Sequence, residues 1–215
     1  MTFNSSEVAA VILAGGRGVR IGGGKPAVLL AKEPLILHVW RRIQPQVDIL
    51  MINGSATGPE QNISFPQQNT LWVNDALPDW QGPLSGVLGA MNRLVEIAPA
   101  CRFLMTIPCD TPFLPHNLAT KLWEADVRND IIRCASSGGR IHPLIGLWPL
   151  ALRDALDHAV RSEGVRKVFD WLNRRPHRVV AWPEAPIDSF LNINTPTDLA
   201  IAEAFLTRAS VKALV

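Results

Sequence analysis

Hydrophobic runs of strand length alternate with amphipathic segments through the first half of the chain. Four such runs end in glycine, aspartate or proline, at residues 7–15, 47–54, 69–75 and 101–108. The run at 7–15 lacks alternation, which is typical of a strand buried on both faces of a parallel sheet. Segments 35–43 and 83–97 have the apolar spacing of helices, and Pro34 and Pro83 stand where helices often begin.

The second half of the chain continues this pattern with shorter elements. Helices are predicted at 115–125, 150–161, 165–173 and 195–206, and strands at 130–137, 141–149 and 177–183. Strands that alternate with helices indicate βαβ units. We therefore expect an α/β, single-domain, Rossmann-like three-layer fold, with a mostly parallel, mixed central sheet covered by helices on both faces. The domain is predicted to span 1–208, with a loosely held tail at 209–215.

Composition narrows the class of protein. Apolar residues make up 47% of the 215 residues, and the net charge is +2, which gives no electrostatic reason to expect nucleic acid or a membrane surface as a partner. The sequence has no apolar run of about 18 residues that would predict a membrane span, and no signal-peptide pattern. Cys101, Cys109 and Cys134 match no paired metal motif or disulfide framework, which favours a reducing cytoplasm.

A basic, glycine-rich segment, LAGGRGVRIGGGK, extends from Leu13 to Lys25. A dinucleotide fingerprint would need a glycine at Ile21, and a Walker A loop ending at Lys25 would need one at Val19, so neither pattern fits. Glycines still let backbone N–H groups face an anion, and the two arginines and the lysine add charges that reach phosphate oxygens. The segment predicts a phosphate site, although a basic surface loop without a ligand has the same composition.

Polar residues follow the other predicted parallel strands as well: Asn53, Asp75 and Asp110. Ligands bind at the carboxyl ends of the strands in such sheets, so we expect these residues and the glycine-rich segment to meet at one edge. Asp110 is well placed for Mg²⁺, which prefers one or two carboxylates together with substrate phosphates and water. For Asn53 a simple turn is the alternative, because Asn-Gly is a common turn dipeptide.

The chain resembles the nucleotidyltransferases, and more closely the molybdenum cofactor guanylyltransferase family. The segment from Leu13 to Lys25 is similar to the signature L-A-G-G-x-x-x-R-x-G-x-x-K. Four further stretches carry the resemblance in the expected order: NDALPDWQGPLSGVLGAM, IPCDTPFLP, HPLIGLW and FLNINTPTDLA. Together they cover nearly the whole chain. One departure is Gly24, which stands where the family commonly has an aspartate.

The resemblance implies transfer of GMP from GTP to the terminal phosphate of molybdenum-molybdopterin, with Mg²⁺ as cofactor and pyrophosphate as the second product. It implies catalytic roles for Lys25, Arg20 and Asp110, with Asp110 also the metal ligand. The implied nucleotide-binding residues are Leu13, Ala14, Gly15, Gly16, Lys25, Asn53, Asp75, Gly82, Pro83, Leu84 and Asp110. The chain up to about residue 112 would hold the nucleotide, and the remainder would hold the pterin acceptor through His142, Asn192 and Asn194.

The implied partners are GTP and molybdopterin or molybdenum-molybdopterin, with transient contacts to other cofactor-biosynthesis proteins or target molybdoenzymes. A cytidylyl or other NTP-dependent nucleotidyltransferase is an alternative, against which LAGG and GPLSG favour guanine. A non-catalytic nucleotide-binding accessory module is a second alternative, but such a module would be expected to lack Lys25 or Asp110, and both are present. His142 also fits a core position, and Asn194 with Thr195 is also a typical helix N-cap signal.

Overall fold

A seven-stranded sheet forms the centre of the molecule in the computed structural model, which describes residues 3–15, 24–54, 58, 62–66, 70–79, 81–126 and 128–212. The strand order is β5-β4-β1-β6-β8-β7-β9. The strands are β1 (Val8–Leu13), β4 (Ile49–Asn53), β5 (Leu71–Val73), β6 (Phe103–Pro108), β7 (Ile132–Ser137), β8 (Arg140–Pro149) and β9 (His177–Ala181). Within this sheet β8 alone runs antiparallel to its neighbours, which confirms the predicted mostly parallel, mixed sheet.

Strand β1 lies at the heart of the sheet and explains the missing alternation in its sequence. It pairs in parallel with β4 on one side and β6 on the other, and all six of its residues are buried. Helices cover both faces, so each side chain of β1 enters an apolar layer. Ala10 and Ile12 enter one layer, and Ala9 and Val11 enter the other.

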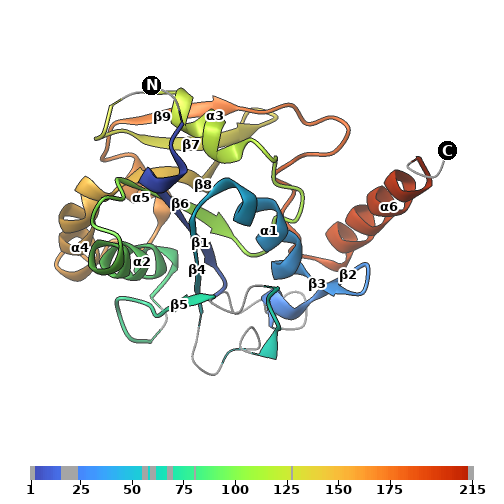
Figure 1. Ribbon diagram of the computed structural model, residues 1–215, viewed down its shortest axis with the longest axis horizontal. Helices are drawn as coiled ribbons and strands as arrows, with labels where there is room; N and C mark the ends of the chain where they lie inside the picture. The colour runs from blue at the N-terminus through green and yellow to red at the C-terminus, as the bar shows by residue number, and fades with distance from the viewer. Residues whose placement is uncertain are drawn as a thin grey trace.

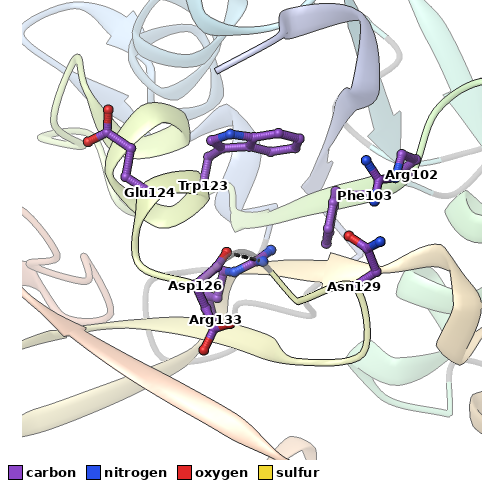
Figure 2. A pocket seen from close by; sticks show the side chains of 7 residues that line it. All are labelled: Arg102, Phe103, Trp123, Glu124, Asp126, Asn129 and Arg133. Atoms are coloured by element: carbon purple, nitrogen blue, oxygen red, sulfur yellow. Dashed lines mark hydrogen bonds between the residues drawn. The ribbon is translucent and has the colours of Figure 1, made fainter. Parts of the chain in front are cut away.

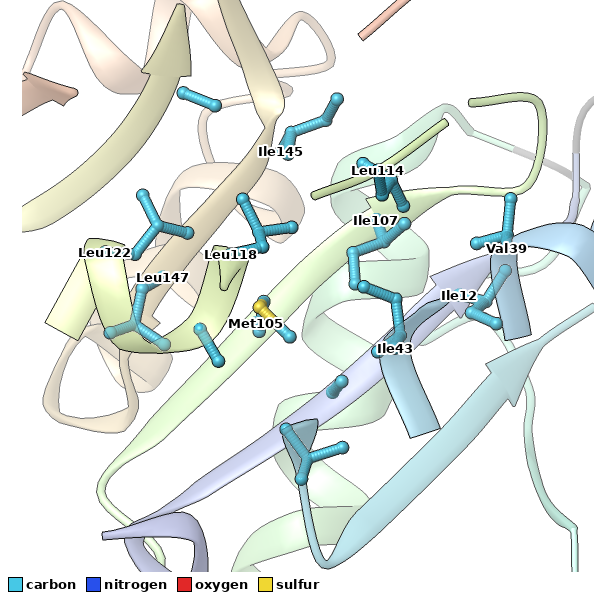
Figure 3. Packing of buried hydrophobic residues seen from close by; sticks show 14 of the residues in the cluster. Ile12, Val39, Ile43, Met105, Ile107, Leu114, Leu118, Leu122, Ile145 and Leu147 are labelled. Carbon is cyan, nitrogen blue, oxygen red and sulfur yellow. The ribbon is translucent and has the colours of Figure 1, made fainter. Parts of the chain in front are cut away.

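The helices lie on both faces of the sheet, as predicted (Figure 1). On one face α1 (Leu35–Ile43) and α3 (Leu118–Glu124) pack over the strands, and Figure 3 shows Val39, Ile43 and Leu118 of this layer around Met105 and Ile107 of β6. The other face carries α2 (Pro83–Ile97), α4 (Arg153–Arg161) and α5 (Val168–Leu172). These two apolar layers complete the three-layer α/β fold.

Several elements differ from the sequence prediction at their ends. The predicted helix 150–161 begins with a 3-10 turn, η6 (Leu150–Leu152), before α4, and α3 and α5 are shorter than expected. Further 3-10 turns in the described part of the chain include η1 (Ser5–Glu7), η3 (Lys25–Ala27) and η4 (Gln44–Gln46). In the described part of the chain, no helix is both long enough and apolar enough to cross a bilayer.

The last helix, α6 (Pro196–Lys212), packs beside a short hairpin that the sequence did not predict. The hairpin joins β2 (Leu29–Leu30) and β3 (Glu33–Pro34), and with α6 it forms a third apolar cluster apart from the main sheet. In Figure 1, α6 projects away from the sheet. The backbone at 209–212 continues this helix, where a tail is predicted, because the sequence there contains neither proline nor glycine to end it.

Candidate active site

The carboxyl ends of three neighbouring parallel strands meet at one edge of the sheet. Leu13 at the end of β1 is level with Asn53 of β4 and with Pro108 of β6. Backbone hydrogen bonds continue beyond the strands: Ala14 N donates to Asn53 O at 2.7 Å, and Cys109 N donates to Leu13 O at 3.2 Å. The loops after these strands therefore begin from a rigid base.

A hollow of about 670 Å³ lies at this edge, next to the N-terminus of α2. Eight of the predicted nucleotide-binding residues line it: Leu13, Gly15, Lys25, Asn53, Asp75, Gly82, Pro83 and Asp110. Ala14 and Leu84 do not, because both are buried in the core layers against the sheet. Gly16 and Arg20 lie outside the described residues. The structure thus gathers residues that are up to 97 positions apart in sequence, from Leu13 to Asp110.

Lys25 and Asp110 form an ion pair at the floor of this hollow. Lys25 begins the 3-10 turn η3, and Gly24 before it adopts the left-handed conformation, with φ 58°, which glycine takes without strain. Only 15% of the Lys25 side chain and 6% of the Asp110 side chain are exposed. The pair is therefore a nearly buried contact between the glycine-rich segment and the loop after β6.

Two asparagines from the segment before α6 complete this contact. The Asn194 side-chain oxygen accepts a hydrogen bond from Lys25 Nζ. The Asn192 amide lies against the Asp110 carboxylate, and with its nitrogen facing the carboxylate it donates to both oxygens. Ile193 N also donates to the backbone oxygen of Asp110 at 2.9 Å. These bonds hold two predicted catalytic residues, Lys25 and Asp110, together with two predicted acceptor-binding residues, Asn192 and Asn194.

Burial raises the pKa of the Asp110 carboxyl, while the neighbouring Lys25 ammonium acts in the opposite direction. Desolvation disfavours the charged form of a carboxyl group, and a cation within contact distance favours it. An ion, a phosphate or a proton that enters the hollow therefore acts on a carboxylate with little solvent around it. The pKa of such a carboxyl group depends strongly on the charge of a ligand that binds beside it.

Asn53 and Asp75 form a second polar pair in the same hollow. The Asn53 amide nitrogen donates to Asp75 Oδ1 at 3.0 Å and to Val73 O at 3.3 Å. Asp75 is half-buried, and burial raises the pKa of its carboxyl. The turn alternative for Asn53 does not describe this position, because its side chain is buried and donates to Val73 of β5 and to Asp75, two residues beyond that strand.

Helix α2 approaches these two residues closely through its glycines. A Cβ atom at Gly86 would lie 2.2 Å from Asn53 Oδ1, and one at Gly89 would lie 2.1 Å from the backbone oxygen of Asn74. Ser85 Oγ also accepts a hydrogen bond from Leu77 N at 2.9 Å. The GPLSG segment therefore fixes the loop that carries Asp75. Gly89, which the sequence did not single out, lets the helix backbone approach the same loop at Asn74.

A second, wider hollow of about 1640 Å³ adjoins the first. The two share Lys25, Pro83, Pro108, Asp110 and Leu144. His142 and Asn192 line the second hollow, as do three cationic residues that sequence reasoning missed: Arg140, Arg166 and Lys167. Asn194 does not line the second hollow, but its side chain contacts Lys25, which does. No motif marks these cations in the sequence, because they lie in ordinary loop and strand segments.

His142 is held at the wall of the second hollow. Its Nε2 forms a 2.8 Å hydrogen bond with Ser137 Oγ, and its ring packs against Phe190 with centroids 5.0 Å apart. Burial lowers the pKa of its imidazole, so the neutral form is favoured at neutral pH. The His142 side chain therefore packs against Phe190 and also lines the second hollow.

The site suits a divalent ion that brings most of its own ligands. No group of three or more His, Cys, Asp or Glu residues gathers in the described part of the chain. Asp110 is a single buried carboxylate at the junction of two hollows lined by cations. One carboxylate with substrate phosphates and water is the arrangement that Mg²⁺ commonly adopts, so the residues present fit this ion.

Comparisons with known proteins agree across nearly the full length of the chain. Residues 10–179 match the MobA-like NTP transferase domain family. A molybdenum cofactor guanylyltransferase of Sinorhizobium fredii (strain NBRC 101917 / NGR234) is 38% identical over 99% of this chain and 98% of its own. One of Bradyrhizobium sp. (strain ORS 278) is also 38% identical, over 93% of each chain.

Solved structures share the fold. A molybdopterin-guanine dinucleotide biosynthesis protein A from Archaeoglobus fulgidus superposes with a TM-score of 0.71 at 24% identity, over 94% of this chain and 99% of that one. A 4-diphosphocytidyl-2C-methyl-D-erythritol synthase from Anaerococcus prevotii superposes with a TM-score of 0.67 at 14% identity, over 95% and 100%. At these identities the likeness concerns the fold alone, and it confirms the predicted architecture.

Proposed function

Because this chain belongs to the molybdenum cofactor guanylyltransferase family, we propose that it transfers GMP from GTP to the terminal phosphate of molybdopterin, in the form that carries molybdenum. One observation carries the proposal in structural terms. Two adjoining hollows share the buried Lys25–Asp110 pair, so a nucleotide in one and an acceptor in the other would meet at these two side chains.

In the proposed reaction, an oxygen of the acceptor phosphate forms a new bond to the α-phosphorus of GTP. The bond from the α-phosphorus to the bridging oxygen breaks, and its electrons leave with pyrophosphate. Lys25 would stabilise the negative charge that collects on the phosphate oxygens, and the asparagines around it would fix its position. Transfers of this kind depend mainly on positioning and on preorganised charge.

Mg²⁺ is the cofactor that we propose, with Asp110 as its one protein ligand among the described residues. When bound, it would neutralise phosphate charge and polarise the phosphorus–oxygen bonds. Asp110 can serve in this way only when ionised. The ion pair with Lys25 would open as the ion and the triphosphate bind, because Lys25 gains phosphate oxygens in exchange for the carboxylate.

Asp75 is the proposed recognition group for guanine. It lies in the first hollow, where Oδ1 accepts from Asn53 and no described residue donates to Oδ2, which we propose as the acceptor for a ligand. A carboxylate accepts hydrogen bonds from the N1–H and N2–H₂ edge of guanine, which cytosine does not present. The first hollow, bordered by β1, β4 and α2, would hold the nucleotide, and the second, bordered largely by residues after 139, would hold the pterin.

The remaining predicted residues keep their proposed roles. Gly16 and Arg20 would contact the triphosphate, and Leu84 could do so only through its backbone, because its side chain is fully buried. Arg166 and Lys167 add positive charge to the proposed pterin hollow, which suits an acceptor phosphate. A cytoplasmic location and transient contacts with other cofactor-biosynthesis proteins stay predictions.

Pyrophosphate release with purified protein tests the assignment. Release is expected with GTP, Mg²⁺ and molybdenum-molybdopterin together, and it should stop when EDTA removes the metal. Competition by CTP, ATP and UTP against labelled GTP should be weak. A clear preference for CTP would favour a cytidylyltransferase, and binding of GTP without any release would favour an accessory module.

A further inference from the structure

A separate pocket lies at the other end of the sheet, around the start of β6 (Figure 2). Its empty volume is about 460 Å³, and its lining includes Arg102, Phe103, Trp123, Asn129 and Arg133. From here β6 extends through five further residues to Pro108, two positions before Asp110. At about 3.3 Å per strand residue, roughly 20 Å separates this pocket from the proposed transfer site.

Arg133 is the unusual feature of this pocket. The residue is 1% exposed, and its guanidinium lies 4.7 Å from the centroid of the Phe103 ring. Nη2 donates to the backbone oxygens of Asp126 and Arg128. Nε and Nη1 have no hydrogen-bond partner among the described residues. These two nitrogens carry three of the five guanidinium N–H groups, so most of the donors are left unpaired in a buried position.

Among the described residues, no carboxylate forms an ion pair with the Arg133 guanidinium. Asp126 is the acidic residue beside it, but its carboxylate already accepts two hydrogen bonds from the Arg128 side chain. Glu124 is exposed, and in Figure 2 its carboxylate points away from the guanidinium. A buried charge that is not paired destabilises a protein strongly, and a bound anion would remove this penalty better than water does.

The walls of the pocket indicate which anion. In Figure 2 the guanidinium points toward the space between Trp123, Phe103 and Asn129. Trp123 and Phe103 pack edge to face, with ring centroids 5.4 Å apart. Two aromatic walls suit a flat apolar body, and a guanidinium with free N–H groups suits a carboxylate. We propose that this pocket binds a small organic carboxylate with a flat apolar body, through the Nε and Nη1 atoms of Arg133.

Benzoate is the probe that tests this site, with benzamide as the uncharged molecule of the same shape. Benzoate is expected to raise the melting temperature of the full-length protein in a saturable way, because a ligand that binds only the folded state stabilises it. Benzamide is expected to have no comparable effect. An NMR signal of the Arg133 Nε–H group should shift during the benzoate titration and become protected from exchange with water.

Two variants distinguish this pocket from the cationic hollow near the transfer site. Arg133→Met keeps an aliphatic stem over Phe103 but removes the guanidinium, and it should weaken benzoate binding at least tenfold. Arg166→Met removes a cation from the other hollow and should leave benzoate binding unchanged. If Arg133→Met does not fold, the NMR titration and a crystal structure of the unchanged protein with benzoate decide the question.

The proposal is overturned if benzoate produces no shift, or if its effect disappears in Arg166→Met and persists in Arg133→Met. A preference for inorganic phosphate over benzoate would also overturn the carboxylate assignment. A crystal structure in which water alone meets Nε and Nη1 at saturating benzoate would show that Arg133 has only a structural role. GMP transfer is measured separately, so failure here leaves the proposed function untouched.

Discussion

Single side chains in the proposed nucleotide hollow are held in arrangements that reduce the stability of the folded protein. Asp110 and Asp75 are both carboxyl groups whose pKa burial raises. An isolated carboxylate is more stable in water than in such a position. Groups of this kind are common in sites that bind charged ligands, because the ligand supplies the interactions that the solvent no longer does.

Replacing Asp75 with asparagine is therefore expected to stabilise the protein at pH 7. The folded-state pKa of Asp75 lies above its unfolded value of about 3.9. As pH rises through the interval between these values, the folded state binds more protons than the unfolded state, so the free energy of unfolding falls. The advantage of Asp75→Asn should shrink as pH is lowered toward about 4, and urea denaturation at both pH values measures it.

The exposed Asp48→Asn is the matched control for this substitution and should change stability little at either pH. The KM for GTP should rise in Asp75→Asn, because asparagine presents an N–H₂ group as well as an oxygen to the guanine edge. Equal or lower stability than the unchanged protein at pH 7, with an unchanged KM, would contradict the role given to Asp75.

At the scale of elements, two helices position the site through their ends and their close approaches. Helix α2 comes so near to the ends of β4 and β5 that Gly86 and Gly89 leave no space for a Cβ atom. Helix α6 begins with a capping box, in which Asp198 Oδ2 accepts from Thr195 N at 2.8 Å and Thr195 Oγ1 accepts from Asp198 N at 3.2 Å. Asp198 Oδ2 also accepts a hydrogen bond from the backbone nitrogen of Asn194, and the side-chain oxygen of Asn194 accepts one from Lys25.

Gly86→Ala should disturb the nucleotide hollow from within α2. The new Cβ would displace the Asn53 side chain, which would lose its hydrogen bonds to Asp75 and Val73. We expect a loss of about 1–3 kcal/mol in unfolding free energy, typical of overpacking, and a higher KM for GTP. Val95→Ala on the exposed side of α2 is the control. A Gly86→Ala protein with normal stability and normal GTP affinity would contradict this packing.

Asp198→Ala should affect turnover as well as stability. Loss of the cap is expected to destabilise the protein by about 1 kcal/mol. It also frees the backbone of Asn194, whose side chain accepts from Lys25, so kcat should fall more than KM rises. Asp198→Glu, which retains a capping carboxylate, should recover most of kcat. Steady-state kinetics of both variants check this, and a stability loss without any change in kcat would refute the link to Lys25.

The sequence predicts much of the fold and a large part of the proposed site. Strand-end positions were enough to expect Asn53, Asp75 and Asp110 at one edge, because parallel topology brings them together. The short hairpin at β2–β3 was missed, since its turn residues Ala31 and Lys32 have positive φ angles that their residue types do not suggest. The cations of the second hollow were missed because only the folded chain brings them to the hollow that Asp110 also lines.

At the scale of the whole molecule, two hollows open onto one pair of catalytic candidates. The hollows are adjacent and share five lining residues, so GTP and the pterin acceptor would be bound together. Direct transfer between them needs no covalent enzyme intermediate. Initial rates measured against both substrates should therefore give intersecting double-reciprocal lines. Parallel lines, together with release of pyrophosphate before the acceptor is added, would indicate a guanylylated enzyme and would contradict direct transfer.

Single-turnover transfer by Asp110→Asn tests the central claim most directly. The protein is mixed with α-labelled GTP, Mg²⁺ and molybdenum-molybdopterin, and labelled dinucleotide is measured over time beside the unchanged protein and the Asp48→Asn control. Loss of a preorganised charge of this kind lowers rates by roughly 10²-fold or more, so we predict at least that loss in a variant with the normal melting transition. Near-normal GMP transfer by folded Asp110→Asn would contradict the proposal that Asp110 and Lys25 carry the reaction.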